Sequence, residues 1–195
     1  MDKNYEKTIK SKTELSEKEL RNEENILKAL ENHDLDKMKK IGELFNLTKE
    51  QLKLSSQYAI LRKEIIAKIW RDIDKRKKES PQKTNQEQKL GIYLEQLEPQ
   101  VKDAVLKLQE KGYKTYESGF KLFGDQMIGF SEEYFKNSEI LKNLQNELKK
   151  ENINLEIKYD HINISFKKFY SVKEMKEVWD RIADGLPKLL NKPSE

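Results

Sequence analysis

The sequence predicts an α+β protein in which an N-terminal helical bundle precedes a C-terminal domain with a small four-stranded, mainly antiparallel sheet and helices. Two observations support this prediction. Helical periodicity dominates the chain up to residue 79, and the C-terminal half contains two pairs of strand-like runs. Helical segments precede, separate and follow these pairs, so the expected element order is αββαββα. Such an order favours a sheet with its helices on one face.

The most clearly patterned stretch is residues 152–187. Apolar residues alternate with polar ones in two runs, first Leu155, Ile157 and Tyr159 and then Ile162, Ile164 and Phe166. This period of two predicts a hairpin, with Asp160 and His161 as its turn. Ser171 and Glu174 have the spacing of a capping box, so a helix is expected to start there. Trp179 lies on the apolar face of that helix and is predicted to be core.

The first 79 residues are expected to contain a disordered tail, residues 1–13, and a helical domain, residues 14–79. Asp34 can cap a short helix, and Thr48 and Gln51 form a second capping box that opens the longest helix. Helix-forming residues also dominate from Glu14 to Asn32, so three helices are expected, and these most simply form a small bundle. Trp70 lies beside the apolar stripe of the longest helix and is also expected in the core.

Residues 80–87 are polar, unpatterned and contain Pro81, so they are predicted to be a linker. The α+β domain would then span residues 88–187, beginning with a short helix at 88–96, and a loose tail would follow at 188–195. The run Gly112-Tyr113-Lys114-Thr115 resembles segments of small bacterial α+β proteins, and this resemblance carries no function across.

Composition narrows the class of protein. The chain has 39 basic and 35 acidic residues, so any affinity for nucleic acid must come from local clustering. Absence of cysteine excludes disulfides and thiolate metal sites, and two histidines argue against a zinc site, so we expect no metal and no cofactor. We see no apolar leader and no membrane-length apolar run. We therefore expect a cytoplasmic protein without membrane contact.

One candidate site is basic and lies at the end of the longest predicted helix. It consists of Lys68, Arg71, Lys75, Arg76, Lys77 and Lys78. Clustered lysine and arginine side chains on a helix can contact phosphates, which points to nucleic-acid binding. The alternative is a solvated helix end whose cations complement the helix dipole. Asp72 and Asp74 dilute the cluster.

A second candidate site is a polar cleft around residues 117–126. Its members are Glu117, Ser118, Asp125 and Gln126, in the glycine-containing region between two predicted strands. Neither a nucleophile elbow nor a phosphate-binding loop is present. The alternative interpretation is that these residues only turn a hairpin, because glycine and polar residues dominate turns.

The leading functional hypothesis is a non-catalytic binding or adaptor protein whose partner is nucleic acid or another protein. No acid–base constellation stands out in the sequence, and binding requires none. One alternative is a small enzyme, a hydrolase or nucleotide-acting activity, that uses the cleft near residues 117–126. Another is a structural subunit that dimerises through its N-terminal helices. The oligomeric state is left open.

Overall fold

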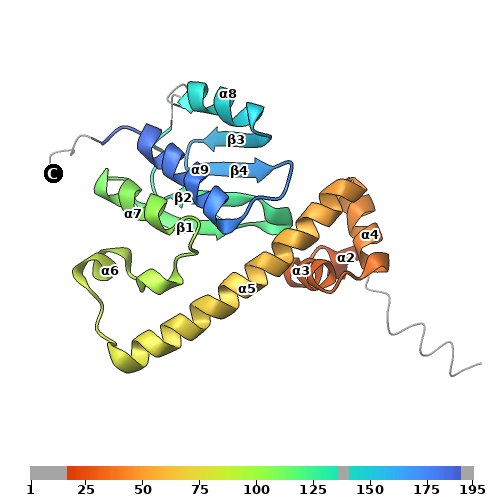
Figure 1. Cartoon of the computed structure of the whole chain (residues 1–195), viewed down its shortest axis with the longest axis horizontal. Helices are drawn as coiled ribbons and strands as arrows, with labels where there is room; N and C mark the ends of the chain where they lie inside the picture. Colours follow the sequence, from red (N-terminus) through yellow and green to blue (C-terminus); the bar gives the residue numbers. More distant parts are fainter. Residues whose placement is uncertain (1–16, 136–140, 190–195) are drawn as a thin grey trace, which may run out of the picture.

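The structure is a computed structural model that describes residues 17–135 and 141–189, and it confirms the α+β class. Figure 1 shows a small helical part and a helix-covered sheet, joined by one long helix, α5. In chain order the described elements are α2 (Glu17–Leu20), α3 (Glu23–Glu31), α4 (Leu35–Phe45), α5 (Lys49–Glu79), α6 (Asn85–Leu90), η1 (Leu94–Gln96), α7 (Lys102–Glu110), β1 (Thr115–Phe120), η2 (Leu122–Gly124), β2 (Gln126–Phe130), α8 (Lys142–Lys150), β3 (Ile153–Lys158), β4 (His161–Phe166) and α9 (Val172–Gly185).

The sheet has the strand order β1-β2-β4-β3, and every neighbouring pair is antiparallel. The connection through α8 therefore crosses over β4, which lies between β2 and β3. The predicted β3–β4 hairpin is present. Lys158 pairs with His161, so the turn is Tyr159-Asp160 and lies one residue earlier than expected.

Helices α7 and α9 contact each other and lie across one face of the sheet (Figure 1). Trp179 on α9 is fully buried there, together with Ile162 and Ile164 of β4, as the alternating pattern predicts. Helix α5 also reaches this core through Tyr58, whose hydroxyl accepts the backbone N–H of Tyr170 at 2.9 Å. The long helix is therefore fastened directly to the loop before α9.

The N-terminal helices form a second core. Its buried members are Leu20, Ile26, Ala29, Leu30, Met38, Ile41, Leu52 and Ala59. The predicted caps are confirmed: the Asp34 side chain accepts the N–H of Lys37, and Thr48 and Gln51 form a capping box at the start of α5. Because α5 contributes side chains to both cores, the division into two domains stays a prediction.

In the segment after α5, the first helix starts and ends earlier than the predicted linker at residues 80–87 and helix at residues 88–96 would allow. Helix α6 already begins at Asn85, and Gly91 ends it in the left-handed conformation. The start was missed because Thr84 and Glu87 form a capping box within the stretch that we interpreted as unpatterned. Side-chain hydrogen bonds hold the preceding loop. In one of them the Tyr93 hydroxyl donates to the Pro81 carbonyl at 2.7 Å.

The prediction that Trp70 lies in the core is wrong. Its side chain is 60% exposed, whereas Trp179 is 0% exposed. Helix α5 has 31 residues and is about 46 Å long, so its distal half extends beyond the elements that could cover more than one of its faces (Figure 1). Ile65 and Ile73 take the buried face there, and Trp70 is left on the exposed one.

Candidate ligand pocket between α4 and α5

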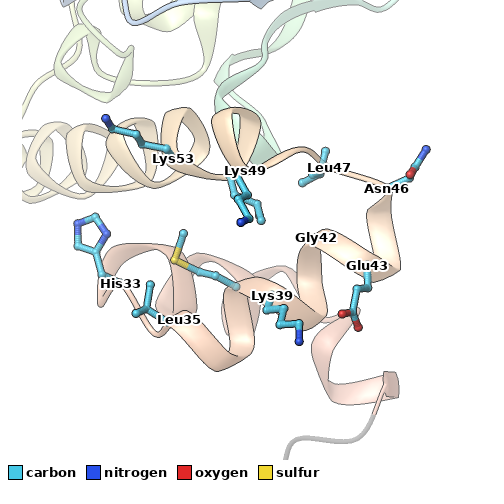
Figure 2. A pocket seen from close by; sticks show the side chains of 11 residues that line it. His33, Leu35, Lys39, Gly42, Glu43, Asn46, Leu47, Lys49 and Lys53 are labelled. Atoms are coloured by element: carbon cyan, nitrogen blue, oxygen red, sulfur yellow. The ribbon is translucent and has the colours of Figure 1, made fainter.

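A pocket of about 670 Å³ lies between α4 and the first turns of α5, as Figure 2 shows. This volume falls within the range of about 300–1,000 Å³ that is typical of ligand sites. The lining residues are His33, Leu35, Met38, Lys39, Gly42, Glu43, Asn46, Leu47, Lys49, Leu52 and Lys53. Most of the lining surface is apolar, and the polar groups lie around it.

Local backbone geometry creates this pocket. His33 precedes α4 with φ 50°, and Asn46 ends α4 with φ 53°, so left-handed residues stand on both sides of the helix. Gly42 lets α4 approach α5 closely, since a Cβ atom at this position would lie 2.7 Å from the Cδ1 atom of Leu52. The two turns and this one contact set α4 beside the start of α5.

The apolar lining continues from a buried floor to an exposed lip. Met38 and Leu52 are buried at the floor, and Leu47 is half-buried beside them. Leu35 at the lip is 77% exposed, the largest exposure among the large hydrophobic side chains that the structure describes as exposed. A leucine so open to water, next to a concave apolar surface, is a position where a ligand could add contact.

Positive charge surrounds the lining. Lys39 projects from α4, and Lys49 and Lys53 lie one turn apart on α5. Within residues 17–135 and 141–189, none of these three lysines has an ion-pair partner, and the one carboxylate of the lining is Glu43. The amino end of α5 adds its own partial positive charge. The pocket is therefore electropositive and apolar at once.

His33 adds a polar contact, and its neighbours determine which ring nitrogen carries the proton. The Ser56 hydroxyl donates to the Leu30 carbonyl at 2.5 Å, so its oxygen can only accept at the 3.0 Å contact with His33 Nδ1. Nδ1 therefore carries the proton. In the singly protonated ring, Nε2 is then the nitrogen that can accept.

The predicted basic cluster is spread along α5 rather than gathered at one point. Five of its members are exposed, namely Lys68, Arg71, Lys75, Lys77 and Lys78. Arg76 instead has an 18% exposed side chain and lies 3.3 Å from the Glu87 carboxylate and 3.8 Å from that of Glu95. Backbone N–H groups of Thr84 and Leu94, with Arg76 beside them, lower the pKa of Glu87 to about 2. Arg76 thus fastens α5 to the segment that follows.

The four residues of the predicted cleft do not converge. Gln126 is fully buried in the helix–sheet core, where its Oε1 accepts the Trp179 Nε1–H at 2.6 Å. Glu117 is exposed and pairs with Lys121, while Ser118 lies half-buried opposite Ile128. None of the four lines the α4–α5 pocket.

Asp125 is exposed as a residue, but desolvation of its carboxyl, with repulsion from Glu156, raises its pKa to about 6. Gly119 in the same region serves packing, since a Cβ there would lie 2.6 Å from the Glu98 Oε1 atom. The small-enzyme alternative remains an untested prediction.

No family model, curated protein or solved structure matches this chain. Among the described helices, none combines the length and apolar character needed to cross a membrane. Nor do histidine and acidic side chains gather in threes to hold a metal ion within the part of the chain that the structure describes.

Sequence reasoning missed the α4–α5 pocket. One local signal was available: Lys49 and Lys53 have the i, i+4 spacing that places two cations on one face of a helix. That signal does not show that an apolar surface lies between them and Lys39, since this depends on how two helices pack.

Proposed function

We propose that this protein is a non-catalytic binding protein that holds an anionic, amphipathic ligand in the α4–α5 pocket. The observation that supports it is the set of three unpaired lysines, Lys39, Lys49 and Lys53, around an apolar lining. Unpaired ammonium groups attract an anion, and the apolar lining contributes about 25 cal/mol for each Å² that a ligand removes from water. A ligand that carries negative charge and an apolar surface would interact with both the lysines and the apolar lining.

The test uses anilinonaphthalene sulfonate, a fluorescent anion with an apolar body, and the variant K39E/K49E/K53E. Exposed charge contacts contribute about 0.5 kcal/mol each, so losing three should weaken probe binding about tenfold or more. Added salt should weaken wild-type binding as well. Fluorescence titration measures both effects, and near-UV circular dichroism checks that the variant is folded.

The matched control is K68E/R71E/K77E, which makes the same change in net charge at the far end of α5, on side chains that are also exposed. It should keep wild-type affinity for the probe. Equal loss in both variants would mean that overall charge governs binding, and the pocket would then not be the site.

A second candidate function is nucleic-acid binding on the distal half of α5. One observation favours it: Trp70 is 60% exposed, Arg71 follows it, and Lys77 lies two turns further along the same side of the helix. Exposed aromatic rings beside cations can stack on unpaired bases while the cations contact phosphates. This candidate uses a different surface from the pocket.

A further inference from the structure

Building on the proposed function, we infer that the occupant of the α4–α5 pocket is an acidic amphipathic helix of a partner protein. The inference commits to a helix rather than to a small amphiphile such as a fatty acid. Three features support it: the length of the lining along α4, the exposure of its lip, and the charges on both of its sides.

The lining follows one face of α4 over its whole length. Leu35, Met38, Gly42 and Asn46 are separated by three or four residues, which places them in a row on the helix surface. These positions extend over about 16 Å, or three helical turns. A partner helix that presents apolar residues at the same spacing would lie in the groove that α4 forms with α5.

The exposed lip argues against a small ligand. Sites for small molecules usually bury about 70–90% of the ligand surface, which requires walls that enclose it. Leu35 is 77% exposed and contributes little to such a wall. A helix placed along α4 would cover Leu35 and would complete a layer of three helices with α4 and α5.

The charges lie on both sides of the groove. Lys39 stands on the α4 side, and Lys49 and Lys53 stand on the α5 side. A partner helix therefore needs acidic residues on each flank of its apolar stripe. Figure 2 shows His33 and Leu35 at one end of the pocket and Glu43 and Asn46 at the other. Because the single carboxylate lies at one end, the acidic residues of the partner should concentrate at the His33 end.

The experiment uses synthetic peptides of about 18 residues, roughly 27 Å long as helices. The first carries leucines three and four residues apart, flanked by glutamates. A second has lysine in place of each glutamate, and a third has a central proline that breaks the helix. Dodecanoate represents a small amphiphile. Fluorescence anisotropy measures peptide binding to the full chain, and displacement of anilinonaphthalene sulfonate reports on the pocket.

We expect the acidic helix to bind at least about tenfold more tightly than its lysine and proline counterparts. Leu35→Ala and K49E/K53E should each weaken it by a similar factor. Tyr159→Ala should not, because Tyr159 is also an exposed hydrophobic side chain but lies on the β3–β4 turn, outside the pocket lining. Leu35 is exposed, so its variant should keep the wild-type melting temperature.

The remaining outcomes separate this inference from the proposed function. If dodecanoate displaces the probe and the acidic helix does not bind, the inference is wrong and the proposed function stands. If all three peptides bind equally, the inference is likewise wrong and the proposed function stands. If sedimentation shows a dimer that L35A abolishes, a second copy of the chain is the occupant, and the inference is wrong. If the probe, dodecanoate and peptides all fail to bind, both proposals are wrong.

Discussion

The two tryptophans show how single residues of one type take opposite roles in this chain. Trp179 is fully buried, and its Nε1–H donates to Gln126 at 2.6 Å, so a buried amide depends on it. Gln126 in turn donates to the Met175 sulfur. Trp70 is 60% exposed and belongs to neither of the two cores that the described residues form. The same side chain is therefore structural at one position and free for contacts at the other.

Replacing each tryptophan should separate these roles. Trp179→Ala should lower the free energy of unfolding by about 3–5 kcal/mol, because it leaves a large cavity in the helix–sheet core. Trp179→Phe should cost about 1–3 kcal/mol, since Gln126 loses its buried donor. Trp70→Ala serves as the matched control and should change stability by less than about 0.5 kcal/mol.

Urea unfolding followed by circular dichroism measures all three values. A change below about 1 kcal/mol for Trp179→Ala would contradict the packing of α9 on the sheet.

Among the elements, α5 carries the most connections. Its first half contributes to both cores, and its last turns are linked to the following segment through Arg76. The guanidinium reaches Glu87, Glu95 and the Gln82 carbonyl, the last at 3.1 Å. Tyr93 lies beside it, with the guanidinium carbon 5.8 Å from the ring centre. Arg76 thus joins α5, the loop before α6 and η1.

Removing this side chain should release the segment at residues 80–90. We expect Arg76→Ala to be cut there by trypsin or another protease several-fold faster than wild type, because local opening governs such cleavage. Lys77→Ala is the matched control, since Lys77 is the exposed neighbour and should leave the digestion pattern unchanged. Mass spectrometry of the fragments locates the cuts. Equal digestion of both variants would contradict the role of Arg76 as a link.

At the scale of the whole molecule, α5 separates two surfaces of different chemistry. Its amino end forms one side of the apolar, lysine-rimmed pocket, and its distal half exposes Trp70 among cations. The helix is about 46 Å long, which exceeds the Debye length of about 8 Å at physiological salt. Charge changes on one surface should therefore leave binding at the other unaffected.

Nucleic-acid binding can be tested on the distal surface without disturbing the fold. The variant K68E/R71E/K77E/K78E keeps Arg76 and changes exposed residues only. If these side chains contact phosphates, the variant should lose affinity for single-stranded RNA or DNA. Each lost contact should flatten the logarithmic salt slope by about 0.7. Filter binding at several salt concentrations measures this slope.

The pocket variant K39E/K49E/K53E is the control, with an identical type of substitution at the other end of α5. Wild-type protein that binds neither RNA nor DNA at low salt would exclude this second candidate. Loss in both variants alike would indicate a general effect of charge.

The sequence by itself determined the class of fold, the hairpin of β3 and β4, and the starts of α4, α5 and α9. These features depend on residues that are close in the chain: the alternation of Ile162 and Ile164, and the capping boxes at Thr48 and Ser171. Such interactions act within a few residues, so their patterns can be recognised without knowing the rest of the fold.

Only the tertiary structure decided which surfaces are free. Arg76 is engaged and Gln126 is buried because elements from elsewhere in the chain pack on them, whereas Trp70 is exposed because it lies outside both described cores. The pocket depends on left-handed turns at His33 and Asn46 and on the close approach of α4 to α5 at Gly42. Periodicity describes one face of one helix. A cavity requires the relative placement of two helices, which their packing sets.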